Sequence, residues 1–505
     1  MIPAIDNFLN RITMYRLVLY SLVFLWITGF MLSMFGTLQI NSLDLLISSC
    51  IIFASCILIN ICYQTIFKAP SNPESTYITS LILSLVAGPE NSARGFILLV
   101  ALCFIAISSK YLIAIQKKHI FNPAAFSMAV MAYFLSYYPS WWIGDAILYP
   151  FVIIVGVLIT RKLQRFDLVI SFLLVFMITS IGTISSLQDA FLSGKNLFAY
   201  SPILFFSFIM LTEPSTTPPK RSLRMLYGSL TAILIAPFFH LGSIYLAPES
   251  ALILSNIFSY LISPKKKLLL VLKNKKKISL NTYEFSFSND KKFNFKPGQY
   301  MEWTLPHKKS DDRGLRRYFT LSSSPTEDII SIGVKFYDKP STFKEGLNNL
   351  KIGEKVIASQ LAGEFILPEN KDKKLVFIAG GIGVTPFRSM IKYLVDKDEK
   401  RDIVIFYAVN SYEDISFKEV FDDAEIKLGI KTVYIIRDSK NVPAGFLHKN
   451  GMLNEKMISE EVKNVKERVF YISGPRVMIV SFDKSLKNIG VKRASIKTDF
   501  FPGYT

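Results

Sequence analysis

The segment Ala379-Gly380-Gly381-Ile382-Gly383-Val384-Thr385-Pro386 follows an apolar run and precedes an amphipathic stretch. Glycines at a strand-to-helix turn let backbone N–H groups approach a pyrophosphate, and the helix N-terminus favours its negative charge. A glycine-rich turn also occurs for packing alone, but its position between a strand and a helix favours dinucleotide binding. The residues expected to form this turn are Gly380, Gly381, Gly383, Val384, Thr385 and Pro386.

The pattern around this turn predicts two kinds of sheet. From Lys373 onward, buried apolar runs alternate with helical stretches, as in a doubly wound parallel sheet; the runs are Leu375–Ala379, Ile403–Tyr407, Thr432–Ile436 and Val469–Ile472. Before it, short alternating runs separated by turn residues predict a small antiparallel barrel; they are Leu268–Leu272, Thr282–Phe287, Tyr300–Leu305, Tyr318–Ser322, Ile330–Phe336 and Lys355–Ser359. We therefore expect a β-barrel domain over 264–371 and an α/β domain over 372–505.

The remaining half has a different composition. The chain has 505 residues, a formal net charge of +19 and 19% charged residues, whereas soluble proteins average about 25%. Residues 1–263 hold only 14 Lys/Arg and 9 Asp/Glu, which leaves 44 and 30 for residues 264–505. This contrast excludes a single soluble globule and a disordered or collagen-like chain.

Residues 1–263 are expected to form a polytopic helical membrane domain. A spanning helix needs about 20 mostly apolar residues. The candidate spans are 14–35, 43–66, 77–88 (short), 96–116, 121–138, 145–160, 167–186, 197–212, 225–246 and 250–263. With both termini cytoplasmic, eleven Lys/Arg fall in inner loops and two in outer loops, as the positive-inside rule requires. We expect ten helices in the cell (inner) membrane, with the second half of the chain in the cytoplasm.

The positions of the cysteine, histidine and lysine residues limit which metal sites and partners we expect. All four cysteines lie in the first half, so the second half cannot hold a Cys-ligated iron–sulfur cluster or a disulfide framework. His240 is the only histidine deep in an apolar run. The usual pair of haems needs several histidines on facing helices, so the helices have too few of them, and we expect no metal site. Seven Lys/Arg crowd into Lys265–Lys277; this suits the anionic leaflet of the bilayer or a solvated linker better than nucleic acid.

Two polar sequences interrupt the apolar half, around Phe121-Asn122-Pro123-Ala124 and around Thr212-Glu213-Pro214. Their prolines indicate helix boundaries, because proline begins or ends helices. They also resemble motifs of a membrane-subunit family shared by the sodium-pumping NADH:quinone reductase and the Rnf electron-transport complex, over roughly residues 75–240. That family esterifies FMN to a Ser-Gly-Ala-Thr threonine, but the outer loop here reads Leu192-Ser193-Gly194-Lys195-Asn196. The resemblance therefore leaves open a non-covalent second flavin (FMN or riboflavin) or a quinone pocket.

A second signal in the charged half is Arg317-Tyr318-Phe319-Thr320-Leu321-Ser322. With the glycine turn about 60 residues later, it resembles the ferredoxin–NADP reductase superfamily. The resemblance implies that the motif from Arg317 to Thr320, Tyr318 included, binds FAD. Arg317 would neutralise its pyrophosphate, Phe319 would pack on the isoalloxazine, and Thr320 would hydrogen-bond near N5. Further residues implied to bind the cofactors are Ser341 and Thr342 at the FAD phosphates, Ser473, Gly474 and Pro475 beneath the nicotinamide, and Phe500, Phe501 and Tyr504 as an aromatic cover over the flavin.

These features, together with the resemblance, predict a membrane-bound NAD(P)H dehydrogenase. The resemblance implies that Thr320, Thr385 and Ser473 serve catalysis. Asn410, where NADPH-specific members often place arginine, favours NADH, although Arg437 could compensate. Electrons would pass from NAD(P)H through FAD to a membrane acceptor, a quinone or a second flavin. Two alternatives stay open: electron export to an extracellular flavin or ferric acceptor, and an ion-coupled pump or transporter with a reductase domain. The sequence does not identify partner subunits.

Overall fold

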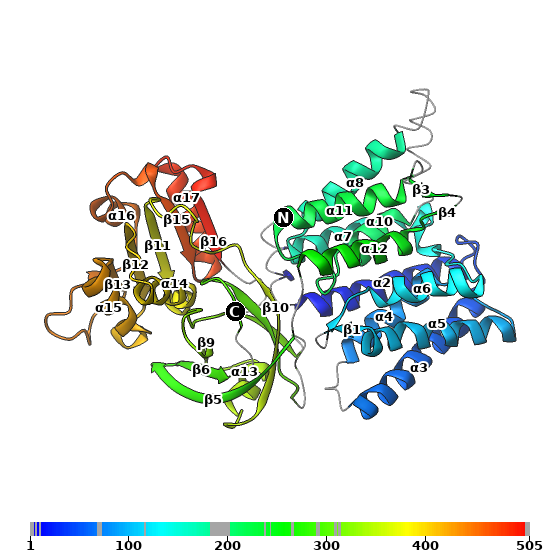
Figure 1. The fold of residues 1–505 in the computed structure, drawn as a ribbon, viewed down its shortest axis with the longest axis horizontal. Helices are drawn as coiled ribbons and strands as arrows, with labels where there is room; N and C mark the ends of the chain where they lie inside the picture. Colours follow the sequence, from blue (N-terminus) through cyan, green and yellow to red (C-terminus); the bar gives the residue numbers. More distant parts are fainter. Residues whose placement is uncertain are drawn as a thin grey trace. The chain divides into compact units, whose positions relative to one another are not determined.

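The computed structural model describes Ile5, Phe8, Leu9 and residues 12–67, 73–115, 118–181, 202–236, 239–242, 244–263, 267–288, 293–307, 311 and 315–499. The chain divides into two compact units. The first comprises Met1–Lys267, and the second comprises Leu268–Asp311 and Leu315–Thr505. Figure 1 traces both units along the chain.

Among its described residues, the first unit is built mainly of helices. They are α2 (Met14–Met34), α3 (Ser42–Phe67), α4 (Pro73–Val86), α5 (Ala93–Leu112), α6 (Pro123–Leu135), α7 (Tyr149–Leu163), α8 (Phe166–Ile181), α10 (Ile203–Phe205), η3 (Phe206–Met210), α11 (Arg221–Ile235) and α12 (Pro248–Ile262). Short hairpins pair β1 (Ala114–Ile115) with β2 (Lys118–His119) and β3 (His240–Leu241) with β4 (Ile244–Tyr245).

Four helical segments are long and apolar enough to cross a membrane: Met14–Met34, Ser42–Phe67, Ala93–Leu112 and Ala146–Leu163. Two shorter apolar helices, Pro123–Leu135 and Phe166–Ser180, accompany them. Within the described residues, the ten expected spans are therefore not all matched by a helix of spanning length. Parts of the expected spans 167–186, 197–212 and 225–246 lie outside the described residues. The expectation for His240 is wrong: α11 ends at Ile235, and an exposed His240 lies on strand β3. The physical reason is in the sequence, because Pro237 cannot continue the helical hydrogen bonding.

The second unit begins with the predicted antiparallel barrel. Its six strands are β5 (Leu268–Ser279), β6 (Thr282–Ser288), β7 (Tyr300–Thr304), β8 (Arg316–Thr320), β9 (Ile330–Lys335) and β10 (Lys355–Ala362), in the order β8-β7-β10-β5-β6-β9. The two outer strands approach each other, because Ser322 after β8 donates its N–H to Ser331 O of β9 at 2.8 Å. Helix α13 (Thr342–Asn348) contributes Phe343 to the barrel core.

The predicted parallel sheet follows. Its strands are β11 (Leu375–Gly380), β12 (Ile403–Val409), β13 (Lys431–Ile436), β14 (Lys449–Asn450), β15 (Val469–Ser473) and β16 (Ile496–Asp499), ordered β14-β13-β12-β11-β15-β16. The short strands β14 and β16 were not predicted. The chain order reverses between β11 and β15, and open α/β sheets bind ligands at such a point, outside the carboxyl ends of the strands.

Helices cover both faces of this sheet. Alternate residues of β11 point to opposite faces. Phe377 and its neighbours pack with α14 (Thr385–Asp396) and α15 (Lys418–Leu428), whereas Ile378 and its neighbours pack with α16 (Glu455–Glu461) and α17 (Arg476–Asn488). This arrangement confirms the doubly wound fold.

Candidate functional site

The glycine turn lies at the point where the strand order reverses. Gly381 has a φ of +53°, which a residue with a side chain rarely adopts. A Cβ at Gly383 would lie 2.5 Å from Ser473 O and 2.6 Å from Gly474 N. Only a glycine therefore lets the turn after β11 meet the turn after β15, and this contact brings two of the predicted motifs together.

Helix α14 begins directly after this turn, with Thr385 as its first residue and Pro386 in its first turn. Proline suits this position because its missing N–H would have no helical partner. Thr385 is buried, and its hydroxyl donates to Ile382 O at 3.2 Å. The N-terminal N–H groups of a twelve-residue helix thus point toward the meeting place of the two turns, which is suited to a dinucleotide pyrophosphate.

Thr320 and Ser473 meet at Asp499. Thr320, at the end of β8, donates its hydroxyl to Asp499 Oδ2 at 3.5 Å. Asp499 ends β16 and is the register partner of Ser473 in the parallel pair β15–β16. Burial raises the pKa of the Asp499 carboxyl from 3.8 to about 7, against the opposing effect of the hydrogen bond from Thr320. This carboxyl group can therefore gain or lose a proton near neutral pH.

A second group of residues gathers around Arg317, three residues before Thr320 on strand β8. Arg317 is buried, and its guanidinium lies 5.3 Å from the Phe343 ring and 3.5 Å from Asp311 Oδ1. Asp311 Oδ2 accepts the backbone N–H of Thr342 at 3.1 Å, and the Ser341 hydroxyl accepts the N–H of Lys344 at 3.3 Å. A carboxylate of the chain thus occupies an anion site made by a cation and a backbone N–H, which are the donors that a phosphate needs.

The two aromatic residues of the Arg317–Thr320 motif point in different directions. Phe319 contacts Phe343 with ring centroids 6.0 Å apart, on the same side as Arg317. Tyr318 instead donates its hydroxyl to Glu302 Oε2 at 2.9 Å and packs edge-on against Tyr300. Of the aromatic pair, Phe319 is therefore the one placed with the predicted phosphate group. Phe500, Phe501 and Tyr504 lie outside the described residues.

The first unit joins the two polar motifs that stand about 90 residues apart in sequence. Glu213 accepts from Asn122 Nδ2 at 2.8 Å, and its other oxygen lies 3.2 Å from His119 Nε2. Asn122 also caps α6, since its side chain accepts the N–H of Ala125 at 3.0 Å. Its own N–H donates to Asn256 Oδ1, and Asn256 donates to the Tyr227 hydroxyl, both at 2.8 Å. We call His119, Asn122, Glu213, Asn256 and Tyr227 the helix-end network.

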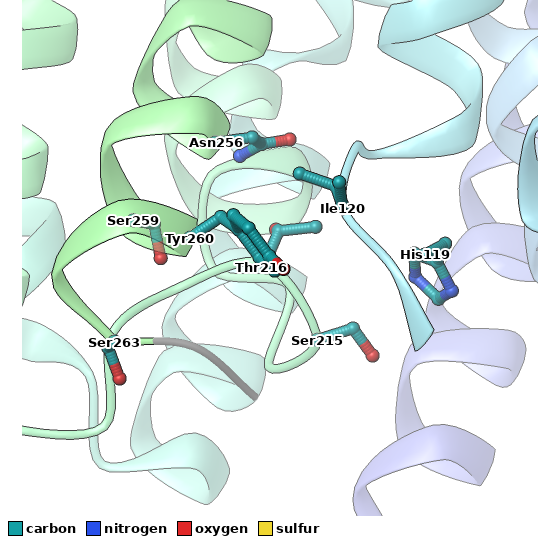
Figure 2. A pocket seen from close by; sticks show the side chains of 8 residues that line it. All are labelled: His119, Ile120, Ser215, Thr216, Asn256, Ser259, Tyr260 and Ser263. Atoms are coloured by element: carbon teal, nitrogen blue, oxygen red, sulfur yellow. The ribbon is translucent and has the colours of Figure 1, made fainter. Parts of the chain in front are cut away.

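A small pocket opens beside this network (Figure 2). The segment before α6, the loop after η3 and helix α12 surround it; its lining residues are His119, Ile120, Ser215, Thr216, Asn256, Ser259, Tyr260 and Ser263. Its volume is about 10 Å³, far below the roughly 300–1,000 Å³ of drug-sized ligand sites. In this arrangement it has room for about one water molecule and none for a flavin ring.

Several site residues were missed by sequence reasoning. Asp499 directly precedes Phe500 and could have been noted there, as an ionisable side chain next to the predicted aromatic cover. Asp311 carries no local signal of its role, since it acquires its partners only through tertiary contacts. Glu213 belongs to a motif that the sequence did indicate, but its contacts with Asn122 and His119 were not foreseen.

Comparisons with known proteins agree with this arrangement. Residues 377–484 match the family model "Oxidoreductase NAD-binding domain". A flavohemoprotein of Bacillus subtilis is 28% identical over 209 residues, 41% of this chain and 51% of that protein. One of Candida albicans is 28% identical over 214 residues, with the same coverage. The chain spans about half the length of the curated relatives it matches.

Solved structures similar to the chain include the FAD/NAD-binding domain of a nitric oxide dioxygenase from Vibrio cholerae. It shows 24% identity and a TM-score of 0.41, and the match covers 46% of this chain and 97% of that one. An Amycolatopsis cytochrome P450 reductase shows 21% identity and a TM-score of 0.42, covering 47% and 70%. The family match and the flavohemoprotein relatives identify the second unit as an NAD(P)H-dependent FAD oxidoreductase.

Proposed function

We propose that this chain is a membrane-bound flavin oxidoreductase that passes electrons from NAD(P)H, through FAD, to an acceptor in the membrane. The observation that carries the proposal is the convergence of three chain segments at one point. The glycine turn after β11, the Ser473–Gly474 turn after β15 and the Thr320–Asp499 pair meet where the strand order of the sheet reverses.

The residues present fit FAD. The anion site around Arg317 and Thr342, now filled by the Asp311 carboxylate, has the donors for a pyrophosphate. Phe319 offers an aromatic face, and Thr320 offers a hydroxyl. Bound FAD would supply the capacity to accept a hydride from a nicotinamide. The chain's own residues would bind and orient the two rings, and Asp499 would hold a proton beside Thr320.

We infer a preference for NADH over NADPH. Asp438 donates its N–H to Asn410 O at 2.8 Å, so an exposed carboxylate stands beside the position that often carries arginine in NADPH-specific members. A carboxylate repels the extra phosphate of NADPH. Arg437 is adjacent and exposed, and it would offset part of this repulsion. Replacing Asp438 with alanine should therefore improve the use of NADPH relative to NADH.

The membrane assignment rests on the apolar helices of the first unit. A quinone is the simplest acceptor, and an inner-membrane location with a cytoplasmic reductase unit follows from the distribution of basic loop residues. The lysines after Pro264 favour contact with lipid. Strand β5 continues to Ser279, so Lys273, Lys276 and Lys277 are exposed on a strand rather than in a linker. Such a basic strand would attract the anionic leaflet.

A second candidate function is electron export through the membrane unit. The helix-end network favours it, because a polar group within an apolar helical unit is costly and usually marks a functional site. Export would require a second carrier, such as a non-covalent FMN or riboflavin, near that network. The pocket of Figure 2 would have to enlarge to admit its ring.

Flavin content tests these proposals. The full chain is purified in detergent and precipitated with acid, and FAD, FMN and riboflavin are quantified in supernatant and pellet. One FAD per chain, bleached by NADH under anaerobic conditions and reoxidised by a soluble quinone, is the expected result. A second flavin in equal amount would favour export. A folded preparation without FAD would contradict the proposed function.

A further inference from the structure

We propose that Arg388 is a positioning residue. It holds the end of the predicted FAD motif, Arg317–Thr320 of the barrel, in place against the glycine turn Gly380–Pro386 of the α/β domain. The inference rests on the proposed assignment of those two motifs. It concerns a residue that the sequence patterns did not single out.

Arg388 reaches from one domain of the second unit to the other. It lies in the first turn of α14, three residues after Thr385. Its Nη1 donates to Ser322 O at 3.1 Å, and both Nη atoms bind the Glu327 carboxylate, with Nη2–Oε1 at 3.0 Å. Only 9% of Arg388 is exposed. Ser322 and Glu327 lie two and seven residues after Thr320, which ends β8.

Neighbouring side chains hold the same segment. Ser389 donates its hydroxyl to Ser323 O at 2.6 Å, and both residues are fully buried. Farther along α14, Asp396 accepts from the Thr326 hydroxyl at 2.5 Å. The Arg388 guanidinium also lies 5.6 Å from the ring of Phe417. The segment after Thr320 is therefore attached along one face of the helix that starts at the glycine turn.

This attachment connects the two halves of the proposed site through a short, buried path. Thr320 continues to Ser322, Ser322 is bound by Arg388, and Arg388 is one helical turn from Thr385. Hydride transfer needs the reacting atoms about 3–3.5 Å apart, and a misplacement of about 1 Å costs roughly a hundredfold in rate. Arg388 bonds neither Thr320 nor Thr385 directly, so it would act through the position of Ser322.

The chain offers a matched control in Arg468. This arginine is 7% exposed and binds Asp402 with both Nη atoms, at 2.7 and 3.0 Å. It also donates to a backbone carbonyl, Leu375 O, at 3.3 Å. The chemistry is the same as at Arg388, but Leu375 begins β11, at the end of the sheet opposite the glycine turn. Its Nε also donates to Lys463 O at 3.2 Å, and all three partners of Arg468 lie within the α/β domain.

The test compares Arg388→Met, Arg388→Lys and Arg468→Met in the full chain in detergent. For each variant, FAD content, thermal unfolding and the half-saturating NADH concentration are measured. An anaerobic stopped-flow instrument measures the rate of flavin bleaching, once with ordinary NADH and once with NADH deuterated at C4. The rate is expressed per bound FAD, so loss of cofactor does not count as loss of rate.

We expect Arg388→Met to lower the rate per FAD by roughly tenfold or more, with a full deuterium isotope effect and a half-saturating NADH concentration within about threefold of wild type. Arg388→Lys should recover part of the rate, because it keeps a donor for Ser322 O. Arg468→Met should lower the unfolding temperature and leave the rate per FAD unchanged.

Equal rates per FAD in wild type and Arg388→Met would overturn the inference, as would equal losses in Arg388→Met and Arg468→Met. If Arg388→Met does not fold, Glu327→Gln and Arg388→Lys measure the same quantity, and unchanged rates in both would overturn it. A folded wild type that binds FAD but is not reduced by NADH would instead contradict the proposed function.

Discussion

In the first unit, Ile97, Phe134 and Ile178 expose 69%, 81% and 69% of their surface, whereas the exposed side chains of the second unit are largely charged. The two units nevertheless place their polar groups at the same kind of position. In the second unit these groups follow the ends of strands β8, β11 and β15; in the first they stand at the start of α6 and just after η3. The ends of a helix leave backbone N–H and C=O groups without a partner in the helix. Such ends can therefore bind polar groups both in the apolar first unit and in the charged second unit.

The strand-end site should fail most completely at Gly383. Gly383→Val would push a side chain into Ser473 O and Gly474 N and separate the turns after β11 and β15. We expect the NADH-dependent bleaching of bound FAD to fall about a hundredfold or more, while FAD content stays near wild type because the barrel is unchanged. Retained bleaching would show that the two turns need not touch.

At the barrel end, Arg317→Ala removes the buried cation. Charged hydrogen bonds contribute about 1.5–3 kcal/mol, so FAD affinity should fall about ten- to a hundredfold, measured by titrating FAD into the cofactor-free protein. Arg316→Ala is the matched control, because Arg316 lies on the other face of β8 and pairs with Glu302. Equal losses in both variants would contradict the assignment of the anion site to Arg317.

The corresponding test in the first unit is Glu213→Ala. It removes the acceptor shared by Asn122 and His119 and should cost about 1–3 kcal/mol for the polar groups left behind. A lower unfolding temperature in detergent would be observed, with FAD content unaltered. Asp44→Ala, which removes a carboxylate from the first turn of α3, should have little effect. If the two variants are equally stable, the network adds nothing to the unit.

The smallest effect is expected at Asp499, and it depends on pH. Its folded pKa of about 7 lies above the ordinary 3.8, so the folded state binds more protons between these values, and stability falls as pH rises toward 7. Asp499→Asn cannot ionise and should abolish about 1 kcal/mol of stability loss between pH 6 and pH 8. Chemical denaturation of both proteins at the two pH values measures the difference, and parallel pH profiles would refute the raised pKa.

Much of the second unit was predictable because its signals are local. Ten of its twelve strands follow alternating or continuous apolar runs, and the Gly380–Pro386 turn lies where the strand–turn–helix pattern puts it. Strand β14 has only two residues, and β16 reads as Ile-Lys-Thr-Asp without a clear pattern. Asp499 was missed with β16, because its partner Thr320 stands 179 residues earlier in the sequence and no local pattern links the two.

In the first unit, hydrophobicity located the helices but not their ends. The expected span 225–246 includes His240 because that run is mostly apolar, but the proline after Ala236 stops the helix before it reaches His240. The motifs at Asn122 and Glu213 were recognised as separate helix boundaries. Their contact could not be foreseen, because no local rule links residues 91 positions apart.

The turn η3 gives Glu213 a particular sensitivity to insertions and deletions. Residues Phe206–Met210 form a π-helix, and Leu211 N–H reaches back five residues to Phe206 O at 2.9 Å. Such a turn contains one residue more than the α-helix would use. Deleting one residue there would restore α-helical winding and rotate the residues after the turn by about 100°. Glu213 would then face away from His119 and Asn122, so a deletion of a single residue within 206–210 should break the helix-end network without changing any of its members.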